Sequence, residues 1–87
     1  MASIVVQIRV RLDSAKADGG RAADALATAV RNLDQAHALL SGETLGSNDP
    51  QLKAATAAVQ RLSAEAARAS AQLRDACRRA SDWGHQL

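Results

Sequence analysis

Two runs of small and apolar residues, spaced alternately by four and three positions, flank a single turn in this 87-residue chain. Such spacing is typical of the seam of a coiled coil, where side chains of one helix pack between those of another. Two runs of similar length therefore predict two long helices of similar length. The first run comprises Val5, Ile8, Leu12, Ala15, Gly19, Ala22, Leu26, Ala29, Leu33, Ala36 and Leu40, and the second comprises Leu52, Ala55, Val59, Leu62, Ala66, Ala69, Leu73, Ala76, Ala80, Trp83 and Leu87.

The segment between the runs, SGETLGSNDP, holds the strongest turn signals of the chain. Gly42 and Gly46 favour the end of a helix, and Asn48 or Asp49 can cap a following helix whose first turn holds Pro50. A short connection makes consecutive helices antiparallel neighbours. We therefore predict a mainly α fold, an antiparallel two-helix coiled-coil hairpin. It forms a single domain over residues 1–87, with helices over 14–41 and 50–83 and a turn over 42–49.

Folding the chain about this turn predicts which seam positions oppose each other. Large side chains then repeatedly face small ones, which lets two helices approach without voids. Gly19 and Gly20 fall inside the first helix, and we interpret Gly19 as making room for Leu73 in a continuous helix. A helix break at this glycine pair is the alternative interpretation. The predicted pairs are Leu40 with Leu52, Leu33 with Val59, Leu26 with Ala66, Gly19 with Leu73, Leu12 with Ala80 and Ile8 with Trp83.

The opening segment SIVVQIRVRL fits two structures. At a period of two, Ile4, Val6, Ile8, Val10 and Leu12 share one face, and the many β-branched residues favour a strand. At helical spacing the same segment continues the first seam. We favour a strand over residues 4–12, which would have to pair with another chain because no second segment has strand character. A helical extension is the alternative.

Composition excludes several classes of protein. No long apolar run could span a membrane, and the N-terminal segment has no cleavable signal peptide pattern because Arg9 and Arg11 interrupt it. The single cysteine, Cys77, forms no disulfide within the chain, and we expect it to be an inert small side chain. We therefore expect a cytoplasmic protein, or one exported without a classical signal peptide.

Catalytic and metal sites are not expected. His37 and His85 would lie at opposite ends of a hairpin, and with Cys77 they do not supply the clustered ligands of a zinc site. A two-helix hairpin also lacks the enclosed pocket that nucleophilic catalysis requires. We predict no enzyme activity, no cofactor and no metal.

Arginines gather at the predicted open end of the hairpin, where they could contact phosphate. The formal net charge is only +2, aspartates share the same end, and the chain has no Tyr or Phe on which bases could stack. A small nucleic-acid-associated protein is therefore the alternative function and not the leading one. The candidate phosphate contacts are Arg9, Arg11, Arg74, Arg78 and Arg79.

The leading prediction is a non-enzymatic protein–protein interaction or scaffolding module. A hairpin of this size leaves apolar side chains that it cannot cover by itself, so we expect it to associate with itself or with another helical protein. Trp83, the lone aromatic residue, fits either core packing against Ile8 or an anchor in a partner. The candidate interface residues are Ile4, Val6, Ile8, Val10, Leu12, Val30 and Trp83.

In its small size, helix–turn–helix organisation and alanine-rich arms, the chain resembles the WXG100, or ESAT-6-like, proteins. That resemblance implies a small dimer linked to a type VII secretion system. The family's Trp-x-Gly lies in the turn between helices, whereas Trp83 and Gly84 here are adjacent and lie in the C-terminal DWGHQL. The tyrosine of the family's C-terminal export signal also has no counterpart, so the resemblance assigns no functional residue.

Overall fold

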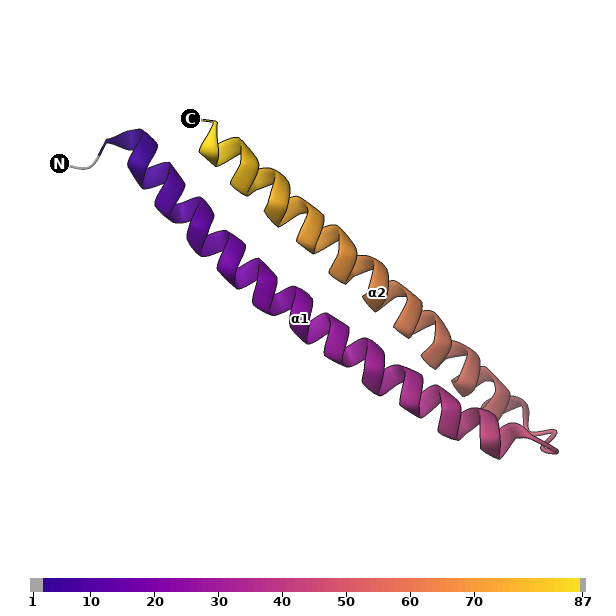
Figure 1. The fold of residues 1–87 in the computed structure, drawn as a ribbon. Helices are drawn as coiled ribbons and strands as arrows, with labels where there is room; N and C mark the ends of the chain where they lie inside the picture. Colours follow the sequence, from indigo (N-terminus) through magenta and orange to yellow (C-terminus); the bar gives the residue numbers. More distant parts are fainter. Residues whose placement is uncertain (1–2, 87) are drawn as a thin grey trace.

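The computed structural model describes residues 3–86, which form two long helices joined by one short turn (Figure 1). Helix α1 spans Ile4–Thr44 and helix α2 spans Pro50–His85. The helices run antiparallel, which confirms the predicted mainly α hairpin. Leu87, the last position of the predicted second seam, lies outside the described residues.

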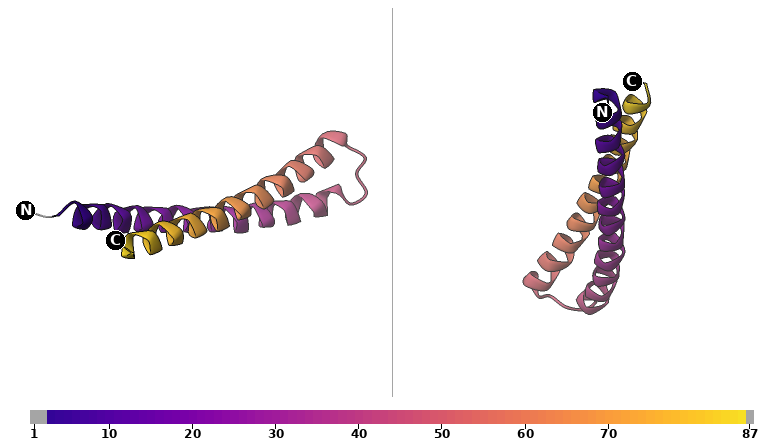
Figure 2. Two further views of the ribbon diagram at one scale, coloured as in Figure 1. Left: turned by 90° about the horizontal axis from the view of Figure 1, so that it is seen from above. Right: turned by 90° about the vertical axis from the view of Figure 1, so that its left-hand side faces the viewer.

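The molecule is a rod. Its extents are 68 × 14 × 14 Å and its radius of gyration is 19.5 Å, against about 12 Å for a compact domain of this length. The two helices cross at a shallow angle, since they lie apart toward the chain ends in Figure 1 but overlap there in Figure 2, where they instead separate toward the turn. Among the described residues, the buried ones lie along the contact between the two helices: Ala23, Ser63, Ser70, Ser81 and Gly84.

The predicted N-terminal strand is wrong, because residues 4–12 are the first turns of α1. Ser3 caps this helix, since its hydroxyl accepts a hydrogen bond of 3.1 Å from the backbone N–H of Val6. Valine and isoleucine cost a helix less than about 1 kcal/mol each relative to alanine. A lone strand would leave every backbone donor and acceptor without a partner in the chain, whereas a helix satisfies them internally. Backbone hydrogen bonding therefore decides against local propensity.

The glycine pair does not break α1, as the preferred interpretation predicted. A Cβ atom added to Gly19 would overlap Sγ of Cys77 and would lie 3.8 Å from Cδ1 of Leu73. At the open end, a Cβ added to Gly84 would lie only 2.7 Å from Cδ1 of Leu12. Each helix thus has one glycine whose lack of a side chain leaves room for a larger side chain of the opposite helix.

These contacts fix a register that differs from the predicted one by about one helical turn. Leu12 faces Gly84 and not Ala80, and Gly19 faces Cys77 as well as Leu73. Half of the predicted seam positions of each helix are also displaced by one residue. On α1, Ala23 and Val30 lie in the seam, next to the expected Ala22 and Ala29. The corresponding shift on α2 involves four positions. The seam holds Ser63, Ser70, Cys77 and Gly84 where Leu62, Ala69, Ala76 and Trp83 were expected. The smallest side chains face the partner helix because they allow the closest approach.

The turn follows the sequence signals. α1 ends at Thr44, and Gly46 adopts a positive φ of 77°, a backbone conformation that glycine tolerates best. Asp49 caps α2, its carboxylate accepting a hydrogen bond of 2.9 Å from the backbone N–H of Gln51. Pro50 occupies the first turn of α2, where a missing N–H costs nothing.

Gly19→Ala tests the close contact between the helices. Alanine normally stabilises a helix interior by about 0.5–1 kcal/mol over glycine. Gly20→Ala should show this gain, because nothing lies within 4 Å of its added Cβ. Gly19→Ala should be less stable than Gly20→Ala in thermal or urea unfolding, since Cys77 must move. Combining Gly19→Ala with Cys77→Ala should remove the difference, and an unchanged difference would contradict this register.

Candidate interaction surface

Small polar side chains of α2 occupy the seam. The buried Ser70 hydroxyl donates a hydrogen bond of 3.0 Å to the backbone carbonyl of Ala23 on α1. One heptad earlier, the Ser63 hydroxyl donates to the carboxylate of Asp34. These bonds satisfy hydroxyl groups that leave water when the helices meet, and no buried side-chain polar atom among the described residues lacks a partner. The seam is therefore closed by hydrogen bonds as well as by packing.

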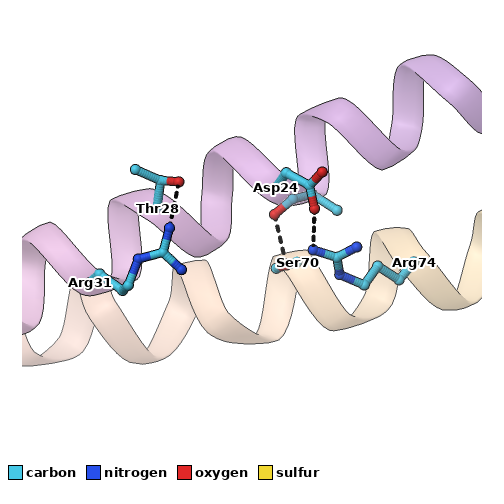
Figure 3. Close-up of polar contacts among 6 residues, drawn as sticks. Asp24, Thr28, Arg31, Ser70 and Arg74 are labelled. Atoms are coloured by element: carbon cyan, nitrogen blue, oxygen red, sulfur yellow. Dashed lines mark hydrogen bonds and ion pairs between the residues drawn. The ribbon is translucent and has the colours of Figure 1, made fainter.

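One side of the seam is polar. Asp24 follows the seam residue Ala23, and its carboxylate pairs with Arg74 of α2 at 2.6 Å across the two helices (Figure 3). Figure 3 also shows Arg31 bonded to Thr28 within α1, at 3.0 Å. A shallow hollow of about 280 Å³ lies on the same side, lined by Lys16, Gly20, Arg74, Cys77, Arg78, Ser81 and Asp82. We call this the polar side.

The other side of the seam is apolar. Successive helical residues are turned by about 100°, so Ala22 and Asp24, which flank Ala23, project to opposite sides of α1. On α2, Ala69 and Ala71 flank Ser70 in the same way. Repeating Ala22 every seven residues from Ile8 to Ala36, and Ala69 from Ala55 to Trp83, gives two stripes without a charged residue. The next position of the first stripe, near the turn, is Glu43. We call these stripes the apolar face: Ile8, Ala15, Ala22, Ala29 and Ala36 from α1, and Ala55, Leu62, Ala69, Ala76 and Trp83 from α2.

Large side chains of the apolar face are open to solvent. Leu62 and Trp83 are each 53% exposed, so Trp83 is not a core residue, which was one of its two interpretations. Leu39, at 74% exposure, borders the same face near the turn. Side chains of this kind normally leave water when a protein folds or associates.

The first turns of α1 add a second exposed apolar region. Since Leu12 faces Gly84 and α2 ends at His85, the residues of α1 before Arg11 have no residue of α2 level with them. Ile4 is 73% exposed and Val6 is 47% exposed. This apolar end exists because α1 is the longer helix.

The predicted interface residues do not form one patch. Ile8 and Trp83 lie on the apolar face, with Ile4 beside it at the apolar end. Val6 and Val10 project to the polar side. Leu12 and Val30 belong to the seam and are half-buried. The sequence prediction missed other residues of the apolar face because it had placed them in the seam: Ala15, Ala22, Ala29 and Ala36 of α1, and Leu62, Ala69 and Ala76 of α2.

Four of the five arginines predicted to contact phosphate already bond to other groups of the chain, three of them to aspartates and Arg9 to a backbone carbonyl. Arg74 pairs with Asp24, and both Arg78 and Arg79 pair with Asp75.

Arg9 donates from Nε to the backbone carbonyl of Gly84 at 3.2 Å, which ties the end of α2 to α1. Arg11 has no such partner among the described residues. The hydrogen bond from Arg78, with the positive charges of Arg78 and Arg79, lowers the pKa of the Asp75 carboxyl. The bond to Asp75 in turn raises the pKa of Arg78. Local ion pairs thus neutralise most of the basic end.

Other candidate groups are dispersed. His37 lies near the turn, where its ring nitrogen is 3.5 Å from the Ser41 hydroxyl, and His85 lies at the opposite end of the rod. Within residues 3–86, no three potential ligands gather where they could hold a metal ion. Neither α1 nor α2, over their described residues, has a stretch long and apolar enough to cross a membrane.

Comparisons with protein-family models, curated proteins and solved structures give no match to this chain.

Ser70→Ala tests the hydrogen bond in the seam. Removing the hydroxyl loses a bond worth about 1 kcal/mol, partly offset by the better helix propensity of alanine. Ser14→Ala is the matched control, because Ser14 is exposed in α1 and should show the propensity gain alone. We expect Ser70→Ala to be the less stable variant in urea unfolding. Equal stabilities would show that the seam bond contributes nothing.

Proposed function

We propose that this protein is a non-enzymatic interaction module that packs a long helical surface against a second copy of itself or against another helical protein. The observation that carries this proposal is the large solvent-exposed area of the hairpin. The hairpin exposes 6301 Å², whereas a folded monomer of 9.1 kDa is expected to expose about 4,900 Å². The rod shape leaves this additional surface in water, and association with a second helical surface would bury part of it.

The thin core gives the same indication. Ala23 is the one apolar residue that is fully buried among the described residues, and no large side chain there is completely buried. Large apolar side chains instead lie on the surface: Ile4, Val5, Val6, Val10, Leu39, Leu45, Leu62 and Trp83. Burial of a side chain of this size contributes about 1.5–3 kcal/mol. Association therefore offers this chain apolar burial that the hairpin seam does not provide.

The ion pairs at the basic end favour protein association over nucleic-acid binding. Phosphate contacts gain affinity from arginines that are free to replace counterions. Arg74, Arg78 and Arg79 would first have to leave Asp24 and Asp75. The exposed apolar area has no comparable competitor within the chain.

Membership of the WXG100 proteins, and with it a link to type VII secretion, is the finer part of this proposal. It is supported by the small helical hairpin alone.

Solution mass tests the proposed function. Light scattering across a dilution series should give a mass above 9.1 kDa that falls on dilution, either for the protein alone or after addition of a helical partner. An apolar dye should bind the unassociated form and be released on association, because dyes of this kind bind exposed apolar surface. A monomer at every concentration that binds no dye would overturn the proposal.

A further inference from the structure

We infer that the apolar face is a homodimer interface, in which a second copy packs with its turn beside the open end of the first. This inference rests on the proposed function and names both its surface and its partner. The assembly would be a four-helix bundle in which all neighbouring helices run antiparallel. The polar side of each hairpin would remain in solvent.

The area of the apolar face fits a dimer interface. From Ile8 to Ala36 the α1 stripe extends about 42 Å at the helical rise of 1.5 Å per residue. Two helices with axes about 8–10 Å apart present a width of roughly 20 Å. The resulting footprint, on the order of 800 Å² per copy, equals what a stable protein–protein interface buries on each partner. The two central stripes of this footprint are uncharged, and its outer rows carry charged residues, among them Arg11, Asp18, Glu65 and Arg79. An apolar centre with a polar rim is typical of a protein–protein interface.

The positions of the large side chains are self-complementary. In a two-fold dimer with antiparallel α2 helices, Leu62 of each copy lies level with Trp83 of the other when the axis passes midway between them, beside Leu73. The two α1 helices of this dimer are antiparallel as well. Ile8 of each copy lies level with Leu39 of the other when the axis passes midway between these residues, beside Ala23.

These two axes coincide. The contact of Gly19 with Cys77 fixes the register of the hairpin, and four residues further along α1, Ala23 stands level with Leu73. A single two-fold axis therefore satisfies both pairs, as an isologous interface requires. Between the large residues, Ala69 of one copy meets Ala76 of the other, and two alanines allow the close approach that lets Leu62 and Trp83 touch. The register of the large residues favours this arrangement.

Charges placed on the apolar face test the interface. Ala69→Glu with Ala76→Glu puts carboxylates at its centre, where they would lose water without gaining a partner. Ala64→Glu with Ala71→Glu is the matched control. It adds the same charge at the same spacing on exposed alanines of α2, on the polar side. We expect the first variant to weaken dimerisation by about two orders of magnitude or more, and the control to dimerise like the wild type.

Each outcome separates this inference from the proposed function. A monomeric face variant beside a dimeric control, both helical by circular dichroism, supports the interface. Two variants that dimerise as the wild type does would overturn it, while leaving the interaction function in place through another surface. A wild-type monomer would also overturn it, and dye binding would then decide the proposed function. Emission from Trp83, the only aromatic residue, should shift to shorter wavelength on dimerisation.

Cysteine crosslinking tests the orientation of the two copies. In a Cys77→Ser background, Leu62→Cys with Trp83→Cys should give a covalent dimer under mild oxidation, while either cysteine alone should not. The two sites lie about 31 Å apart along one helix, far beyond the roughly 7 Å that a disulfide spans between Cα atoms. A disulfide between positions 62 and 83 therefore cannot form within one chain and must join two copies. No crosslink in a dimeric double variant would exclude the proposed orientation.

Discussion

The close approach of two helices along a seam of small side chains governs the rest of this structure. Gly19 and Gly84 each admit a side chain of the opposite helix, and the seam serines bond across the remaining gap. A seam of this kind is narrow and hydrogen-bonded, but it removes little apolar area from water. The chain gains a definite register from it, and it leaves its large apolar residues outside.

The surface of the rod is sorted into two unlike sides. The carboxylates of Asp24 and Asp34 and the guanidinium of Arg74 lie on one side, where they bond to each other or to the seam. The opposite side carries two uncharged stripes, from Ile8 to Ala36 and from Ala55 to Trp83, with charged residues only at their borders. A hairpin that functioned alone in water would gain nothing from this segregation, because scattered charges keep a monomer soluble equally well. The sorting is understandable if one side meets water and the other meets protein.

Sequence patterns predicted the architecture better than the packing. The turn signals from Gly46 to Pro50 and the heptad spacing were enough for the hairpin, because both are local. The strand over residues 4–12 was wrong because β propensity ignores the need for a hydrogen-bonding partner. The displaced seam has a different cause. Ranking positions by hydrophobicity placed Leu62 and Trp83 inside, whereas helices this close accept Ser63 and Gly84. Only the contacts between the helices distinguish a seam from its flank when both are rich in alanine.

The seam also determines the geometry of the apolar face. Its two stripes belong to different helices, so their separation is set by how closely the helices approach at Gly19 and Ser70. A larger side chain at either position would spread the stripes and disturb a surface that it does not touch. Small seam residues therefore serve two levels of structure at once, since they fix the register of the hairpin and set the distance between the two stripes of its apolar face. In such a protein, stability and assembly are coupled, because whatever binds the folded hairpin also stabilises the seam by mass action.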